Sequence, residues 1–195
     1  MPNPTGQWMT GADDRRWWFE SGALAIDFAY TGRVGDDPAR AIDAIDRPAD
    51  LGAWIGERFE QFDGQVGEHE LRDALLFRDA LARTVHAASA GRAPEPGDVD
   101  TINLFAATPD IPPSLAGGTR QAGRSSVRAG QVLSVLARQA VGLLDAANAE
   151  RIRECAADDC AIVFYDESRS NNRRWCSMQR CGNRAKVRKF RAAAQ

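Results

Sequence analysis

The sequence predicts a mainly α N-terminal domain with a few short strands over residues 1–150, the body, and a small cysteine module over residues 151–195. Three observations support this fold class. Apolar residues recur at helical spacing through much of the body. All four cysteines lie in the module, and the two parts carry net charges of opposite sign. A chain of 195 residues is long enough to bury a hydrophobic core.

The composition excludes several other classes of protein. With 44% hydrophobic and 27% charged residues, the chain is neither collagen-like, nor a coiled coil, nor wholly disordered. Its apolar runs are shorter than the roughly 20 residues of a membrane helix, and its N-terminus lacks the basic start and apolar stretch of a signal peptide. We therefore expect a cytoplasmic protein with no membrane partner, in which cysteines are thiols or metal ligands.

Helical periodicity predicts four helices in the body, at residues 48–59, 68–90, 99–107 and 127–149. The two longest should pack together through aliphatic side chains on one face of each: Leu71, Leu75, Leu81, Val85, Val132, Leu136 and Leu143. The apolar segment 23–30 is predicted to be a buried strand or the start of another short element. Gly117-Gly118 is a candidate hairpin turn.

Asp27 is the one charged residue within the apolar segment 23–30. A charge there needs a partner, so Asp27 forms either a buried structural ion pair or a contact to a small-molecule ligand. His69 and His86 are nearly five helical turns apart and cannot share a metal, and both are expected at the surface. The chain has no P-loop, G-x-G-x-x-G, G-x-S-x-G or H-E-x-x-H motif, so we do not expect an enzyme.

The cysteines form two pairs, Cys155-x4-Cys160 and Cys176-x4-Cys181, separated by fifteen residues. Two thiolate pairs joined by a short arm are typical of a tetrahedral zinc site. Four cysteines fill the coordination sphere, so one structural Zn²⁺ is predicted. The alternative is four thiols without a metal. The arm should return as a β-hairpin and a helix should follow Cys181, which together make a treble-clef-like zinc finger of knuckle, β-hairpin and helix.

The run RRWCSMQRCGNRAKVRKFR resembles the signature of the CGNR zinc-finger family, and CAADDCAIVFYDESRSNN resembles the rest of that finger. FESGALAIDFAYTGR is similar to the start of the ABATE domain that usually precedes the finger, although this chain has Tyr30-Thr31 where family members usually have Asn-Thr. The resemblance covers nearly the whole chain. It implies a proposed stress-induced transcription regulator with a zinc ribbon that binds nucleic acid.

Charge supports a polyanionic partner. The cysteine module holds 11 Lys and Arg against 5 Asp and Glu, a net charge of +6, whereas the body holds 14 against 22, a net charge of -8. Such a split indicates nucleic-acid binding, and Arg can hold a phosphate in a bidentate fork. DNA is favoured and RNA is an alternative. The predicted contacts are three residues on one face of the last helix and two on the arm: Arg184, Arg188, Arg191, Arg173 and Arg174.

Three residues of the cysteine module could contribute either to nucleic-acid binding or to the structure of the module itself. Trp175 and Phe164 either stack on bases or pack the small core of the module. Arg184 either contacts phosphate or braces the metal knuckle.

The favoured hypothesis is therefore a zinc-dependent, nucleic-acid-binding transcription regulator whose body senses a small-molecule effector or forms a homodimer. The alternative is a protein-interaction module in which the zinc finger packs on the body and binds no nucleic acid. An enzyme in the body is a third hypothesis. Exposed clustering of the basic residues would favour the first, and their pairing with acidic residues of the body would favour the second.

Overall fold

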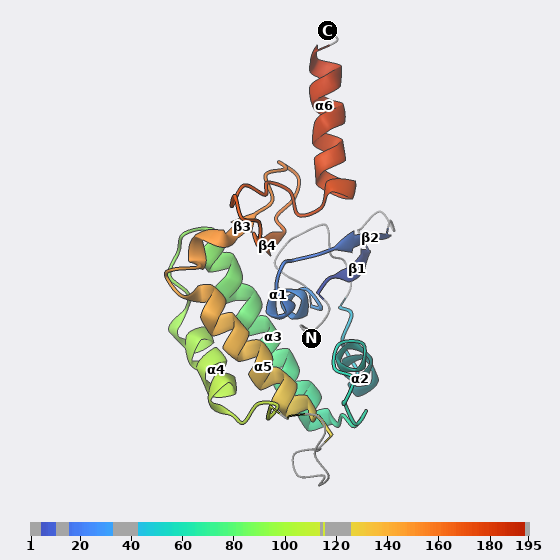
Figure 1. Ribbon diagram of the computed structural model, residues 1–195, viewed down its shortest axis with the longest axis vertical. Helices are drawn as coiled ribbons and strands as arrows, with labels where there is room; N and C mark the ends of the chain where they lie inside the picture. The colour runs from blue at the N-terminus through green and yellow to red at the C-terminus, as the bar shows by residue number, and fades with distance from the viewer. Residues whose placement is uncertain (1–4, 11–15, 33–42, 114, 116–125, 194–195) are drawn as a thin grey trace.

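A computed structural model of the chain describes residues 5–10, 16–32, 43–113, 115 and 126–193. The candidate turn at Gly117-Gly118 lies outside the described residues. Figure 1 shows a helical body with the cysteine module at one end and the last helix projecting beyond it. No helix within the described ranges is both long and apolar enough to cross a membrane.

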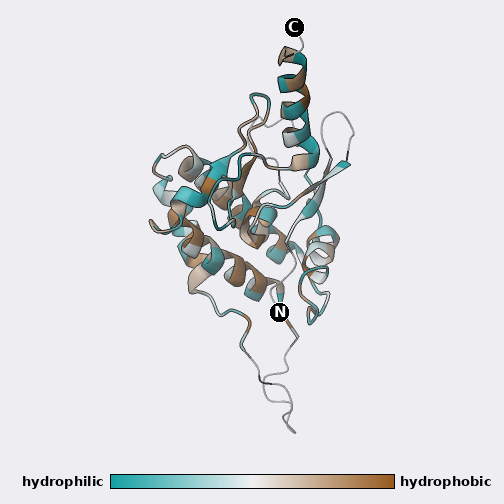
Figure 2. Ribbon diagram, turned by 45° about the horizontal axis from the view of Figure 1, so that its top comes forward, coloured by the Kyte–Doolittle hydropathy of each residue, from teal (hydrophilic) through white to brown (hydrophobic). Residues whose placement is uncertain are grey.

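The body is built around three helices, α3 (Glu68–Ser89), α4 (Pro96–Ala107) and α5 (Ala129–Leu144). These three contact one another, and the short helix α1 (Leu24–Ala29) lies against α3 and α5. Helix α2 (Pro48–Gly56) packs at the side of this group. Figure 2 shows that these helices carry both hydrophobic and hydrophilic residues, and many of the hydrophobic ones are buried in one core.

The expected packing of α3 against α5 is present. Five of the predicted contact residues are buried in the core, namely Leu71, Leu81, Val85, Val132 and Leu136. The other two, Leu75 and Leu143, are partly buried at its edge.

Short-range hydrogen bonds set where the long helices begin and end. At the start of α3, the backbone N–H of Gly67 donates to Glu70 Oε2 at 3.0 Å, and at the start of α5 that of Arg128 donates to Gln131 Oε1 at 3.0 Å. Both are the second half of a capping box. Helix α3 ends in a Schellman motif, with Gly91 at φ 65° and the Arg92 N–H bonded to the Ala87 carbonyl at 2.9 Å.

The segment 23–30 is helical, not the buried strand that was one of the two predictions. All six residues of α1 are buried, so the segment lacks the one-sided apolar pattern that separates a helix from a strand. Its first turn is completed from outside, because the N–H of Ala25 donates to Gln139 Oε1 of α5 at 2.7 Å. A long-range contact therefore decides the conformation of this segment.

Two short hairpins complete the fold. Strands β1 (Gln7–Thr10) and β2 (Arg16–Phe19) pair antiparallel. Met9, Trp17 and Phe19 are buried on the inner face of this hairpin. In the cysteine module, a 3-10 turn (Ala149–Arg151) leads into β3 (Ile152–Glu154), which pairs antiparallel with β4 (Val163–Tyr165).

The predicted hairpin of the module is therefore displaced: β4 pairs with β3, which precedes the first cysteine, and not with the segment that returns to Cys176. The carboxylate of Asp166 explains the difference, because it accepts hydrogen bonds from the N–H groups of Ser168 at 2.9 Å and Arg173 at 2.7 Å. These bonds hold the arm as a loop. A π-helical turn η2 (Met178–Gly182) and helix α6 (Asn183–Ala193) follow.

The body and the cysteine module share one hydrophobic core. Ile162, Val163 and Phe164 are fully buried in it. The N–H of Tyr165 donates to the Ser21 carbonyl at 2.7 Å. Gly22, at φ +82°, allows this approach, since a Cβ there would collide with the Tyr165 carbonyl oxygen. The zinc finger is thus attached to the body by main-chain bonds as well as by packing.

Candidate metal centre and basic helix

The four cysteines come together at the junction of β3, β4 and η2. Their Sγ atoms all lie within 4.8 Å of one another, and all four residues are buried. The Sγ of Cys176 is 3.7 Å from that of Cys160 and 3.6 Å from that of Cys181. Zn–S bonds of about 2.3 Å in a tetrahedron place neighbouring sulfurs about 3.8 Å apart, so these separations fit a tetrahedral ion.

The main chain brings each ligand to the site from a different element. Cys155 follows β3, Cys160 lies three residues before the buried start of β4, and Cys176 ends the loop held by Asp166. Cys181 lies in η2, directly before α6. The knuckle is closed by two bonds, from the Cys155 N–H to the Ile162 carbonyl at 2.8 Å and from the Cys176 N–H to Cys155 Sγ at 3.4 Å.

The chemistry of this donor set calls for a cation. Hydrogen bonds from the neighbouring thiols and from Arg184 lower the pKa of Cys181, whereas hydrogen bonding to Cys155 and the other thiols raises the pKa of Cys176. The four groups cannot all ionise side by side unless a metal compensates their charge. With four soft sulfur ligands and no open position, the site binds one structural zinc ion.

Arg184 braces this centre. Its Nη2 donates to Cys181 Sγ at 3.3 Å, and its guanidinium forms two bonds to Asp159, from Nη1 at 2.8 Å and from Nη2 at 3.2 Å. The hydrogen bond to the Cys181 sulfur is the main cause that raises the pKa of Arg184, and the negative charge of Asp159 raises it further. The residue thus connects α6 to the knuckle between Cys155 and Cys160, which is the bracing use considered from the sequence.

Arg173 has a similar structural position. It is half-buried, with its guanidinium 4.2 Å from the Phe164 ring centroid. Its Nε donates to the Trp175 carbonyl at 3.0 Å, and its Nη2 donates to the carbonyls of Glu20 at 2.7 Å and Cys176 at 2.6 Å. These bonds join Glu20, the residue after β2, to residues 172–179, which we call the metal loop. Arg174, in contrast, is exposed and lies over the Trp175 ring at 5.2 Å.

The remaining predicted contacts lie on α6, which projects away from the body (Figure 1). No residue of this helix is buried. Arg191, Lys186 and Lys189 are exposed, and Arg188 lies 3.9 Å from Asp159. The ion pairs of α6 thus go to Asp159 within the cysteine module, and the helix carries its basic side chains into solvent on several faces. Whether these residues contact nucleic acid stays a prediction.

Asp27 has main-chain partners. Its Oδ2 accepts the N–H of Gly6 at 2.6 Å, and its Oδ1 accepts that of Ser21 at 3.4 Å. Arg58 lies nearby, with Nη2 bonded to the Gly6 carbonyl at 3.1 Å. Burial raises the pKa of Asp27 to about 6, against the lowering effect of these bonds. The contacts tie the N-terminal segment to α1, and a ligand contact at Asp27 stays a prediction.

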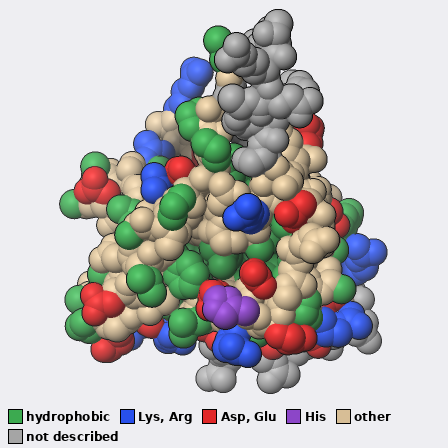
Figure 3. All heavy atoms as spheres, turned by 90° about the horizontal axis from the view of Figure 1, so that it is seen from below, with side chains coloured by type: hydrophobic (Ala, Val, Ile, Leu, Met, Phe, Trp, Pro, Cys, Tyr) green, Lys and Arg blue, Asp and Glu red, His purple; other side chains and the backbone are tan. Residues whose placement is uncertain are grey.

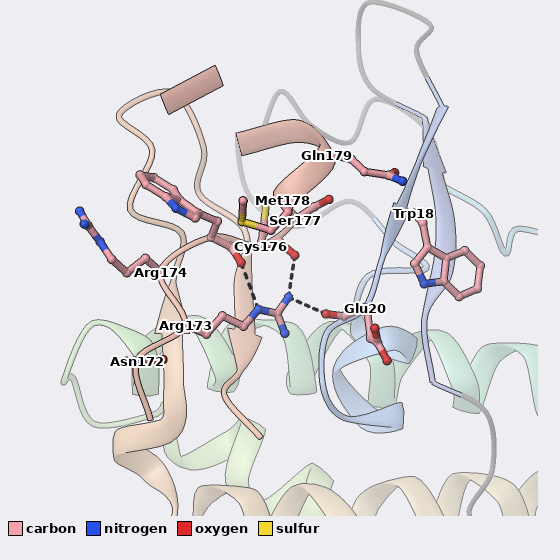
Figure 4. A pocket seen from close by; sticks show the side chains of 10 residues that line it. Trp18, Glu20, Asn172, Arg173, Arg174, Cys176, Ser177, Met178 and Gln179 are labelled. Carbon is pink, nitrogen blue, oxygen red and sulfur yellow. Dashed lines mark hydrogen bonds between the residues drawn. The ribbon is translucent and has the colours of Figure 1, made fainter. Parts of the chain in front are cut away.

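Sequence reasoning missed two features of the site. Tyr30 connects the parts of the molecule, because its hydroxyl accepts the N–H of Val163 at 2.6 Å and lies 3.2 Å from His86 Nε2. A cavity of about 520 Å³ lies between Trp18 of β2 and the metal loop (Figure 4). The aromatic residues of QWMT and RWWF, which favour strands, could have indicated the hairpin that carries Trp18, but strands of four residues give a weak signal.

Two family models match the chain. The family model of the CGNR zinc finger matches residues 151–194. A second family model, ABATE, described as "Putative stress-induced transcription regulator", matches residues 22–147. A search of curated proteins finds no match.

Proposed function

Because the chain belongs to the family of ABATE-domain proteins and ends in a CGNR zinc finger, we propose that it regulates transcription by binding nucleic acid through α6. The zinc ion would hold the base of α6, and the arginines and lysines of the helix would contact phosphate groups. The proposed role is binding, with no catalytic step.

The observation that carries the proposal is the position of α6. The helix stands clear of a body whose net charge is -8, so the acidic residues there do not cover its basic side chains. On the opposite face, seen from below in Figure 3, acidic and basic side chains are interspersed. Eleven residues make a helix about 16 Å long, and the major groove of DNA is about 12 Å wide and admits a helix. Duplex DNA is therefore the favoured partner.

A helix of this length also needs a partner to be stable. Isolated helices shorter than about 12–15 residues are marginal in water, and α6 exposes 77% of Phe190 and 49% of Val187. Figure 2 shows hydrophilic and hydrophobic residues on the same projecting helix. Docking in a groove would cover both kinds of side chain and would neutralise the basic ones.

We further propose that the body senses an effector. A cavity of about 680 Å³ beside α3 is lined by side chains of both signs, which include Arg78, Arg83, His86, Arg92 and Asp98. His86 connects this cavity to Tyr30 and, through the Tyr30 hydroxyl, to the Val163 N–H of β4. A ligand that displaced His86 would therefore disturb a bond between the body and the cysteine module.

One observation favours the alternative of a protein-interaction module. The cysteine module shares its core with the body, and Arg173 is used to join the two. A zinc site could serve this attachment alone. The two hypotheses differ in what α6 does, so the test is made there.

The test is fluorescence anisotropy of labelled 20-bp duplexes of DNA and RNA with zinc-loaded protein, in a salt series that starts at about 50 mM. Three phosphate contacts predict a slope of log K against log salt near about -2.7 on DNA. The double substitution Arg188→Ala with Arg191→Ala should weaken binding and flatten the slope by about 2 while zinc content is unchanged.

The matched control removes the same charge from the body, with Arg72→Ala and Arg128→Ala at two exposed positions outside the effector cavity. It should leave the slope close to that of the unsubstituted protein. Absence of binding to either duplex at about 50 mM salt, where electrostatic binding is strong, would replace the proposal with the interaction module.

A further inference from the structure

The outer face of the β1–β2 hairpin displays two indole rings, those of Trp8 and Trp18. Trp8 pairs with Trp18 directly across the strands, with ring centroids 5.6 Å apart and planes at 77°. The inner face already provides the core contacts. Trp8 is nevertheless 58% exposed and Trp18 39% exposed, and the Arg16 guanidinium lies 5.1 Å from the Trp8 ring centroid. Adjacent exposed aromatic rings mark a binding surface.

Trp18 also forms one wall of the 520 Å³ cavity (Figure 4). Met178, Ser177 and Cys176 lie across from its ring, and the side chain of Gln179 reaches toward it. Glu20, whose side chain is exposed, and Arg173 also line the cavity. The cavity thus has a flat aromatic wall and polar groups at one edge, which suits a planar ring with hydrogen-bonding atoms on its rim.

Both walls are fixed before any ligand arrives. A Cβ at Gly6, whose φ is +92°, would come within 2.5 Å of the Trp18 ring, so the main chain of Gly6 lies directly against the indole. Gly6 is in turn held by Asp27 at 2.6 Å. On the other side, three carbonyl oxygens hold Arg173. A cavity with such fixed walls loses little conformational freedom when it binds a ligand.

The charges around the cavity favour a polyanion. Arg174 is exposed beside it, Arg16 lies over Trp8, and the Arg180 guanidinium lies 5.0 Å from the Trp17 ring centroid. Helix α6, the proposed phosphate-binding element, starts at Asn183, immediately after the turn that lines the cavity. A strand of nucleic acid held along α6 would therefore pass the mouth of the cavity.

We infer that this cavity binds one unstacked nucleobase of a single-stranded segment, with the base against Trp18 and an exocyclic amino group directed at the Glu20 carboxylate. Stacking on an aromatic side chain tolerates every base. A carboxylate only accepts hydrogen bonds. At the exocyclic position that faces Glu20, cytosine offers an amino donor, whereas thymine and uracil offer a carbonyl acceptor, so this contact favours cytosine. The inference rests on the proposed function, in which α6 binds duplex DNA, and adds to it a second site that takes an unpaired base.

The experiment measures anisotropy of labelled dC and dT 12-mers and of the duplex, with zinc-loaded full-length chain at one salt concentration. Trp18→Leu removes the ring and keeps an apolar side chain. It should weaken binding of both single strands about 10-fold or more, change duplex binding less than two-fold, and be largely rescued by Trp18→Phe. The matched control is Leu104→Ala, which truncates an apolar side chain that is 64% exposed on α4.

Glu20→Gln is the second variant, and it leaves the hairpin core untouched. The unsubstituted protein should prefer dC over dT about five-fold or more, and this variant should remove most of that preference. Duplex binding with single-strand affinities that neither Trp18→Leu nor Glu20→Gln changes would overturn the inference and leave the proposed function standing. Absence of binding to duplex and single strands alike would overturn the proposed function as well.

Discussion

Asp27 illustrates how one buried side chain makes stability depend on pH. It is fully buried in α1, and burial raises its pKa to about 6 from an ordinary value of 3.8. Between about pH 4 and pH 6, the folded chain therefore keeps a proton that the unfolded chain has lost. The free energy of unfolding should fall as pH rises through this window, by about 1 kcal/mol between pH 5 and pH 7.5 from this group.

Urea denaturation at those two pH values tests this expectation. Asp27→Asn cannot titrate, so the substituted protein should lack this part of the pH dependence. Asp100→Asn removes an exposed carboxylate from α4 and serves as the control. Identical pH dependence in the Asp27→Asn variant and the unsubstituted protein would show that Asp27 does not hold its proton as the raised pKa requires.

At the same scale, the sequence shows which residues can bind a metal more readily than it shows which residues will contact one another in the fold. The spacing of the four cysteines is enough to predict the metal site and its ligands, because few other roles use two such pairs. Nothing local in the sequence shows that Arg173 is bonded to the carbonyls of Glu20 and Cys176. That role depends on the approach of β2 to the metal loop, which brings together segments far apart in the chain.

At the scale of elements, capped helices could be predicted and contact-dependent segments could not. Helix α3 has its capping residue and its terminal glycine in the local sequence. Helix α1 is completed by Gln139, and β4 is paired by β3 across the first knuckle. In both segments, the residue that decides the conformation lies too far away in the sequence for a periodic pattern to reveal it, which explains these two departures from the sequence prediction.

The folding of the cysteine module should depend on its metal ion. Between the cysteines it buries only a short apolar run around Ile162 to Phe164, so the ion supplies much of its folding energy. Metal analysis should find about one zinc per chain. Cys181→Ser, or a chelator, should unfold β3, β4 and α6 and leave most helical circular dichroism of the body.

Met178→Ala is the matched control, because it alters a half-exposed residue of the same turn that donates no ligand. This variant should keep its zinc. A Cys181→Ser protein whose module remained folded without metal would contradict the role assigned to the ion.

Across the whole molecule, Tyr30 connects the body and the cysteine module through one hydroxyl. Tyr30→Phe would leave the N–H of Val163, which is fully buried, without this acceptor. An unsatisfied buried donor costs about 1–3 kcal/mol. We therefore expect the free energy of unfolding of the zinc-loaded protein to fall by that amount, measured by urea denaturation.

The chain's other tyrosine provides the control. Tyr165 is half-buried in β4, and Tyr165→Phe should change stability by less than about 0.5 kcal/mol. Equal effects of the two substitutions would mean that the Tyr30 hydroxyl contributes nothing specific to the attachment.

The cavity beside Trp18 has walls that are made at different times during synthesis. Residues 18–20 form one side and residues 172–179 the other, so roughly 150 residues must be translated between them. At about 5–20 residues per second, the ribosome needs about 10–30 s to do so. During that interval Trp17 on the nascent hairpin lacks Arg180 above its ring. Until the metal loop has emerged, the two tryptophan-bearing strands therefore display indole surface that the finished fold partly covers.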